Sequence, residues 1–402
     1  MALSTTGLST NALPMGQVTG LQLEGIAQEP IAPSRSSRYY QPGLDVLRCL
    51  AFFFVLNHHV FPKSHTGILS LQSVIQEFGA AGVCLFFTLS AFLITELLLR
   101  EAETSGTIHL RAFYIRRILR IWPLYLLALF VGVVFPHIYH HFPRGEYLLL
   151  PYLLMAGNWA LVLHGETRNT ILAPLWSISV EEQFYVIWPT LFLLWRKRGV
   201  IFASFIILPI AWATDFILPA AHIPKHPQLW FNSFNQFQFF AIGGLLAILM
   251  HRRTLKLALS LRVAALVAAL ACFSLAAFPC HFQNPFVASK PLAIMGGYMA
   301  IDVGCVLFLI AFLDVKLPSL FNPLVYLGKI SYGLYVFHMF ILAAVSHLTE
   351  TVLHLPYSLQ LGLNWIITVL VVIPLAALSY EYFEKPFLRF KERFTFVNSR
   401  SV

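Results

Sequence analysis

Long apolar runs separated by short polar stretches follow one another along most of the chain. A membrane-spanning helix needs about 20 apolar residues, because it rises about 1.5 Å per residue and the hydrocarbon layer is about 30 Å thick. The pattern predicts an all-α, polytopic membrane protein with about ten transmembrane helices, at about 45–61, 79–99, 118–135, 178–195, 200–218, 234–250, 262–279, 292–313, 330–348 and 361–383.

A further apolar stretch, Tyr147–Leu163, is short and contains Pro151 and Asn158. Cytoplasmic loops are enriched in Lys and Arg, so the basic clusters decide whether it crosses the membrane. Ten spans with both termini in the cytoplasm place every basic cluster on the cytoplasmic side, namely Arg35/Arg38, Arg111–Arg120, Arg196–Arg198, Arg252–Arg262 and Lys385–Arg393. An eleventh crossing would place Arg196–Arg198 outside. We therefore expect residues 147–163 to be interfacial or re-entrant.

Composition and net charge exclude two other classes of protein. Apolar residues make up 58% of the chain and charged residues 11%, whereas soluble domains average roughly 45–50% and about 25%. The net charge of +9 comes from clusters between apolar runs, which is typical of membrane proteins rather than of a nucleic-acid-binding surface. We expect a multi-pass protein of the plasma (inner) membrane, with the lipid bilayer as a partner and no nucleic acid.

Three regions are predicted along the chain. Residues 1–40 are rich in Ser, Thr, Gln, Gly and Pro and lack the apolar core of a cleaved signal peptide. We interpret them as a flexible cytoplasmic N-terminal tail, so that the first span serves as an uncleaved signal. Residues 41–390 are predicted to form the membrane domain, and residues 391–402 a cytoplasmic C-terminal tail.

The first predicted span carries Asp45, Arg48 and His59. Arg48 and His59 are 11 residues apart, so at about 100° per residue they share nearly the same helix face, with Asp45 within about 40° of it. His59 would lie about 16 Å deeper than Arg48. Ionisable residues in a membrane usually face the bundle interior, and an imidazole can accept a proton at neutral pH. His59 is therefore a candidate general base, although it can instead simply hydrogen-bond a neighbouring helix; His58 is the weaker candidate.

The sequence WSISVEEQFY places two adjacent carboxylates, Glu181 and Glu182, at the end of an apolar helix. Ser177, Glu181 and Tyr185 are spaced i, i+4 and i+8 and so share one face. Carboxylates facing lipid would be costly, so they are expected to line a polar cavity. There they could orient an imidazole or bind sugar hydroxyls. The alternative is that Ser and the acidic residues only cap the N-terminus of the helix and interact with its dipole.

The sequence FYIRRILRIWPLY places Arg116, Arg117 and Arg120 at the cytoplasmic start of the third span. Guanidinium groups bind phosphate oxygens bidentately, so these three could hold the phosphates of a nucleotide-containing donor. Topology alone, however, also predicts basic residues at this place.

Other candidate groups carry a weaker signal. His338, in the ninth span, is either a second polar partner in the cavity or a core histidine between helices. His137, His140 and His141 are interpreted as an interfacial cluster rather than a metal site. The five cysteines form no CxxC pair, so we expect neither a disulfide framework nor a bound metal.

Six strings in order resemble the integral-membrane acyltransferase-3 family. They are LDVLRCLAFFFVLNHH (44–59), FFTLSAFLIT (86–95), FYIRRILRIWPLY (113–125), LWSISVEEQFYVIWP (175–189), GKISYGLYVFH (328–338) and YFEKPF (382–387). The resemblance covers about residues 40–390. It departs from the family at Cys49 and Ala91, where Gly is common, and this affects helix packing more than chemistry. The chain resembles the short form without a fused extracytoplasmic domain.

The resemblance implies an enzyme, an O-acyltransferase. Such an enzyme moves an acyl group, often acetyl, from cytoplasmic acyl-CoA as co-substrate to a hydroxyl of a carbohydrate, glycolipid or macrolide-like acceptor. The arginine and histidine of the family's first span fall on Arg48 and His59. Its paired arginines fall on Arg116 and Arg117, and its acidic motif falls on Glu181, with Glu182 adjacent.

A mechanism follows as a hypothesis. His59 acts as general base on the acceptor hydroxyl, or forms a covalent acyl intermediate. Glu181 orients or stabilises the imidazole, while Arg48, with the arginines at 116, 117 and 120, holds the donor phosphates. Two other classes remain open: a transporter or flippase of a polar glycolipid or small solute, and a binding or sensing protein without catalysis.

Overall fold

The computed structural model describes residues 39–61, 71–138, 146–165, 171–284 and 289–397. These ranges are built from helices and contain no β-strand, so the all-α prediction is confirmed. Within them, nine helical segments are long and apolar enough to cross a membrane. The predicted N-terminal tail lies almost wholly outside the described residues, and the cytoplasmic placement of both termini stays a prediction.

The long helices carry the apolar runs seen in the sequence. They are α1 (Pro42–Val60), α3 (Ala81–Ser105), α4 (Leu110–Ile138), α7 (Trp176–Ala220), α8 (Ser233–Met250), α9 (Leu259–Ala277), α10 (Pro291–Phe312), α12 (Ser331–His347) and α13 (Tyr357–Leu378). Shorter helices are α2 (Leu71–Gly79), α5 (Glu146–Leu153), α6 (Gly157–His164), α11 (Asn322–Lys329) and α14 (Lys385–Lys391). Single 3₁₀ or π turns are η1 (Ala173–Leu175), η2 (Lys225–Leu229), η3 (Ser319–Phe321), η4 (Leu348–Val352), η5 (Ser379–Glu384) and η6 (Glu392–Phe394).

Helix α7 is two antiparallel helices joined at Arg196. Its 45 residues would reach about 67 Å as a straight helix, about twice the hydrocarbon thickness. The backbone reverses at Arg196, which has φ 53° and ψ −144°. Both halves then contact α8: the Ser233 hydroxyl donates to Gln183 in the first half, and the Gln238 amide donates to Asp215 in the second. Since α7 thus supplies two passes, the described segments fit the predicted ten.

The apolar stretch at 147–163 does not form a spanning helix. It is broken at Met155, where φ is 54°, into α5 and α6, which have eight residues each and so reach only about 12 Å. Helix α5 is fixed by Tyr152, which is fully buried. The Tyr125 hydroxyl donates to the Tyr152 carbonyl at 2.8 Å. The Tyr152 hydroxyl donates in turn to the Ala173 carbonyl at 3.2 Å.

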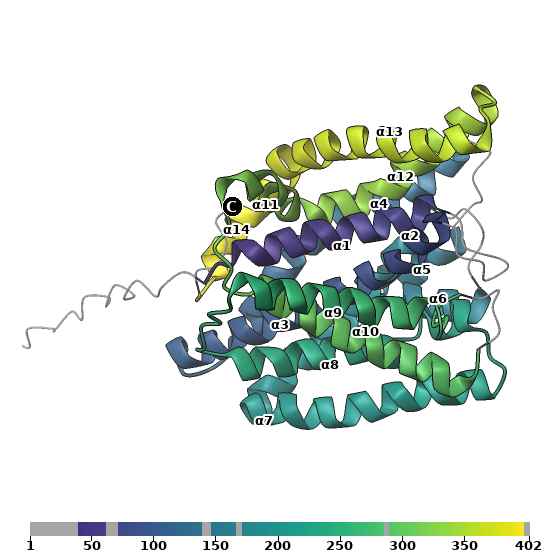
Figure 1. The fold of residues 1–402 in the computed structure, drawn as a ribbon. Helices are drawn as coiled ribbons and strands as arrows, with labels where there is room; N and C mark the ends of the chain where they lie inside the picture. Colours follow the sequence, from purple (N-terminus) through teal and green to yellow (C-terminus); the bar gives the residue numbers. More distant parts are fainter. Residues whose placement is uncertain (1–38, 62–70, 139–145, 166–170, 285–288, 398–402) are drawn as a thin grey trace, which may run out of the picture. The chain divides into compact units, whose positions relative to one another are not determined.

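Helix α1 is the centre of the packing, in contact with α2, α3, α10, α11, α12 and α13. Figure 1 shows α11 and α14 at one end of the long helices and α2, α5 and α6 at the other. Helix α11 approaches α1 so closely at Gly328 that a Cβ atom there would overlap the Asp45 carbonyl oxygen. Glycine is therefore required at this contact, which fixes the end of α1 that carries Asp45 and Arg48.

The C-terminal turn is fastened to α4 by Arg116. Its guanidinium forms an ion pair with Glu101 at 2.7 Å and donates to the Phe394 carbonyl at 2.7 Å. Close by, the His109 ring stacks on Phe396, with ring centroids 4.0 Å apart. Because its N–H groups already serve these partners, Arg116 has a structural role that positive-inside topology did not reveal.

We predict that Gly328→Ala destabilises the protein by about 1–3 kcal/mol, because the added Cβ forces α11 away from α1. The apparent melting temperature of purified protein in detergent measures the effect. Gly296→Ala is the matched control, since a Cβ on this α10 glycine meets nothing within 4 Å. Equal melting temperatures for the two variants would contradict the close contact.

We predict that Arg116→Gln releases the C-terminal turn. A hydrogen bond to a charged group contributes about 1.5–3 kcal/mol, so amide exchange in residues 385–397 should accelerate about 10-fold or more. Hydrogen–deuterium exchange with mass spectrometry measures this rate. Arg111→Gln, at an exposed position of the same helix, should leave it unchanged; unaltered exchange in Arg116→Gln would refute the fastening role.

Candidate active site

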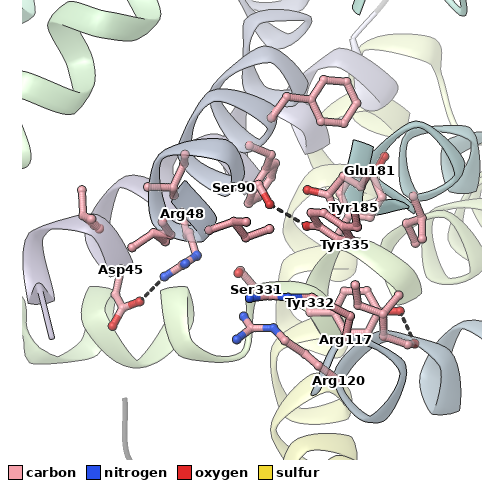
Figure 2. Close-up of a pocket in the computed structure, with 18 of the residues that line it drawn as sticks. Asp45, Arg48, Ser90, Arg117, Arg120, Glu181, Tyr185, Ser331, Tyr332 and Tyr335 are labelled. Carbon is pink, nitrogen blue, oxygen red and sulfur yellow. Dashed lines mark hydrogen bonds and ion pairs between the residues drawn. The ribbon is translucent and has the colours of Figure 1, made fainter. Parts of the chain in front are cut away.

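A first cavity of about 180 Å³ lies between α1, α3, α4, α7 and α12. Apolar side chains of α1 and α3 form part of its wall, and Figure 2 shows the polar groups that project into it. These polar groups are Tyr39, Tyr40, Gln41, Asp45, Arg48, Ser90, Arg117, Arg120, Ser177, Glu181, Tyr185, Ser331, Tyr332 and Tyr335. The cavity thus contains three guanidinium groups and two carboxylates, so its formal charge is positive.

Arg48 is held in place by Asp45, as their shared helix face predicted. The Arg48 guanidinium donates to Asp45 at 2.6 Å, and the other carboxylate oxygen accepts from the Tyr40 hydroxyl at 3.0 Å. Asp45 is buried, while the side chain of Arg48 keeps 18% of its exposure. The pair therefore orients the Arg48 guanidinium where it lines the cavity.

Arg117 enters the cavity from α4 between aromatic rings. Its guanidinium carbon lies 5.3 Å from the Phe113 ring centroid and 5.4 Å from that of Tyr185, within the range of cation–π attraction. Arg120, one turn away, lines the same cavity. Two of the three arginines predicted on this helix therefore face the cavity together with Arg48 (Figure 2).

Glu181 belongs to this cavity as well. Ser177, Glu181 and Tyr185 all line it, so the predicted common face of α7 is confirmed. Glu181 interacts with Arg117 and with the hydroxyls of Ser90 and Tyr185, which are 2.6 Å from each other. The described groups that interact with Glu181 are thus arginine cations and hydroxyls of the first cavity.

A second cavity, of about 230 Å³, adjoins the first. Imidazole and aromatic side chains line it, namely His58, His59, Trp176, His226, Trp230 and Phe231. Trp176 contacts Trp230 and Phe231, with ring centroids 5.8 and 5.0 Å away. Aromatic faces of this kind offer large apolar surfaces beside polar groups.

The turn η2 brings His226 into the second cavity. The neighbouring Lys225 anchors it, because its ammonium donates to the His281 carbonyl at 2.9 Å and to the Ser289 hydroxyl at 3.2 Å. Burial lowers the pKa of Lys225 to about 8. Lys225 therefore anchors the turn that carries His226.

Tyr335 and Val83 line both cavities and so form the partition between them. The Tyr335 hydroxyl donates to the Pro174 carbonyl at 2.7 Å and lies 2.7 Å from the Ser177 hydroxyl oxygen. These bonds tie α12 to η1 and to the start of α7. Arg48 and His59, on one helix, thus reach two cavities separated by a hydrogen-bonded tyrosine.

His59 has aromatic neighbours on two sides. Its ring centroid is 5.3 Å from that of His58 and 5.2 Å from that of His338. His58 contacts the side-chain amide of Gln76 at 3.0 Å. His59 therefore lies in the second cavity, whereas Glu181 lines the first, so the structure does not bring the predicted base and its predicted orienting carboxylate into one cavity.

Two predicted site residues are not among the described residues that line either cavity. Arg116 is bound to Glu101 and the C-terminal turn. Glu182 projects towards α4, where the Trp122 indole donates to it at 3.5 Å. Their roles in binding and catalysis stay predictions. Among the described residues there is no group of three metal-ligating side chains, and the side chains of the histidines at 137, 140 and 141 lie outside the described part.

The sequence analysis did not identify Tyr335 as a site residue. A signal was present: Ser331, Tyr335 and His338 are spaced i, i+4 and i+7, which places three polar groups on one face of an apolar helix. Ser90 was likewise quoted within a motif but not chosen as a site residue. Both face partners on α7 that the local sequence does not show.

The chain is similar to known acyltransferases. A family model described as an acyltransferase domain matches residues 41–381. The peptidoglycan O-acetyltransferase OatA of Listeria monocytogenes is 28% identical over 88% of this chain and 56% of its own length. A putative peptidoglycan O-acetyltransferase of Bacillus subtilis, YrhL, is 27% identical over 86% and 55%. A putative O-acetyltransferase of Staphylococcus aureus is 29% identical over 90% and 59%.

The chain therefore spans a little over half the length of these curated relatives. No solved structure matches it. The family model covers most of the chain, including the helices that carry both cavities, and the resemblance noted from the six sequence strings is confirmed: this chain belongs to the acyltransferase-3 family of membrane proteins.

Proposed function

We propose that this protein is a membrane O-acyltransferase that moves an acetyl group from cytoplasmic acyl-CoA to a hydroxyl of a carbohydrate. The observation that carries the proposal is the pair of adjoining cavities, one with three arginines and the other with imidazoles and tryptophans. Family membership supports acyl transfer. The names of the Listeria and Bacillus relatives, which specify peptidoglycan, support a carbohydrate acceptor.

The arginine-lined cavity is the proposed donor side. Acyl-CoA carries phosphate groups, and guanidinium forks bind phosphate oxygens with charge-assisted hydrogen bonds. Arg48, Arg117 and Arg120 supply such donors. Asp45 orients the first of them, and Glu181 would hold the other two in place until phosphate takes over. This assigns Glu181 to donor binding, next to the cations it contacts, rather than to His59.

The histidine-lined cavity is the proposed acceptor side. Sugar rings have apolar C–H faces and polar edges, which match aromatic walls interspersed with imidazole nitrogens. Trp176, Trp230 and Phe231 supply the walls, and His58, His59 and His226 supply the polar groups. An acceptor hydroxyl in this cavity would reach His59 without entering the donor cavity.

The reaction needs the partition to open between the two substrates. As the acceptor O–H gives its proton to His59, its oxygen forms a bond to the acyl carbon, and the carbon–sulfur bond of the thioester breaks. The thiolate of CoA then takes the proton from His59, so the ester and free CoA thiol are the products. General-base assistance of this kind contributes about 10²–10⁴ in rate. Rotation of Tyr335 away from Ser177 and Pro174 would join the cavities.

We predict that His59→Ala abolishes acetyl transfer while the protein inserts and purifies normally. Purified protein in nanodiscs is incubated with radiolabelled acetyl-CoA and peptidoglycan fragments, and labelled product and free thiol are counted. His347→Ala, on α12 and outside both cavity linings, is the matched control. Transfer retained in His59→Ala would overturn the mechanism, and movement of a solute without acylation would favour a transporter.

We predict that Arg48→Gln and Arg120→Gln each raise the KM for acetyl-CoA about 10-fold or more, because each removes a charge-assisted bond of about 1.5–3 kcal/mol to phosphate. The KM for the acceptor should change little, since the acceptor occupies the other cavity. Arg111→Gln, at an exposed position of α4, provides the control for lost surface charge. If only the KM for the acceptor changed, the arginines would bind the acceptor rather than acetyl-CoA, and the proposal would be wrong.

A further inference from the structure

His338 is a buried imidazole that the proposed reaction does not yet use. It lies on α12, three residues after Tyr335, and has 0% exposure. Its ring packs between Phe52, Tyr335 and His59, with centroids 6.2, 5.5 and 5.2 Å away. A polar ring in such surroundings is costly to bury unless both of its nitrogens have partners.

The tautomer of His338 follows from its hydrogen bond to the Tyr335 backbone. Its Nδ1 lies 2.5 Å from the Tyr335 carbonyl oxygen. A carbonyl oxygen only accepts, so Nδ1 carries the proton. In a neutral imidazole the other nitrogen, Nε2, is then an acceptor. Nε2 is buried and has no hydrogen-bond partner among the described residues, which is unfavourable for a polar atom.

His59 is the ring neighbour that can satisfy this acceptor. Phe52 has no donor, and the Tyr335 hydroxyl is directed to Pro174 and Ser177. The His59 and His338 rings are tilted by 45° and separated by 5.2 Å between centroids. A centroid separation of 5.2 Å allows one N–H···N hydrogen bond between two imidazoles once their nitrogens are directed at each other.

We propose that His338 is a positioning residue that accepts the N–H of His59 and thereby fixes its tautomer. This inference rests on the proposed function of His59. With one nitrogen of His59 donating to His338, the other is left unprotonated and faces the second cavity as the base. When it takes the acceptor proton, His59 becomes a cation, and Nε2 of His338 stabilises that cation through the same hydrogen bond. No proton is transferred to His338, so the balance of the reaction is unchanged.

A neutral partner suits this site better than a carboxylate. Orientation of a basic imidazole by a hydrogen-bonded acceptor is the role that an aspartate plays in serine proteases. Within a membrane, a second full charge would carry a large desolvation cost. His338 supplies the acceptor without that cost. This explains why Glu181, at the arginine end, is not needed beside His59.

Two substitutions separate the two nitrogens of His338. In His338→Gln the amide can place its oxygen near the position of Nε2, which keeps the acceptor for His59. In His338→Asn the shorter amide can place its N–H near the position of Nδ1, which keeps only the bond to the Tyr335 carbonyl. If His338 positions His59, His338→Asn should lower kcat about 10–100-fold with both KM values nearly unchanged, while His338→Gln keeps kcat within a few-fold of the wild type.

The measurement is steady-state transfer from acetyl-CoA to peptidoglycan fragments in nanodiscs, with the melting temperature of each variant as a check on folding. Val336→Ala, a buried truncation on the same helix, controls for loss of packing. If His338 only supports the fold, one of two results is expected. Either His338→Asn keeps kcat and His338→Gln loses it, or both variants lose kcat in proportion to their loss of melting temperature. Each of these results would overturn the inference. If one amide variant does not fold, His338→Leu replaces it, and wild-type kcat in that variant is equally contradictory. An inactive wild-type chain instead refutes the proposed function itself.

Discussion

The hydrogen bonds of one tyrosine hydroxyl join α12, η1 and α7 at the boundary between the two cavities. Tyr335 is tied to the Pro174 carbonyl and the Ser177 hydroxyl, and its ring separates a cavity lined by arginines from one lined by imidazoles. Arg48 and His59, which both lie on α1, therefore line different cavities.

Buried charge in this fold is distributed to match that division. The guanidinium groups that face the first cavity are balanced by Asp45 and Glu181 and shielded by aromatic rings. The second cavity is instead lined by imidazole and indole side chains. Because an isolated charge is costly in a low-dielectric interior, the buried guanidinium groups lie beside carboxylates and aromatic rings. The described lining of the second cavity contains no Asp, Glu, Lys or Arg side chain.

The sequence could predict those features that depend on local periodicity. Apolar run length predicted the membrane passes, and charge placement correctly excluded a crossing at 147–163. Helical spacing predicted that Arg48, Glu181 and Tyr185 face the interior. What it could not predict are partners supplied by distant segments. Arg116 has the same local context as Arg117, yet a carbonyl near the C-terminus binds it. Glu182 is turned towards Trp122 for the same reason, since neighbouring helices decide which face is inside.

Adjacent carbonyls at 173 and 174 receive hydroxyls from opposite directions, one from Tyr152 on α5 and one from Tyr335 on α12. The short helix α5 and the wall between the cavities are thus fastened to the same two peptide groups. A displacement of α5 is therefore coupled to the wall through the 3₁₀ turn η1. The segment that does not span the membrane is thus connected by two hydrogen bonds to the boundary between the cavities.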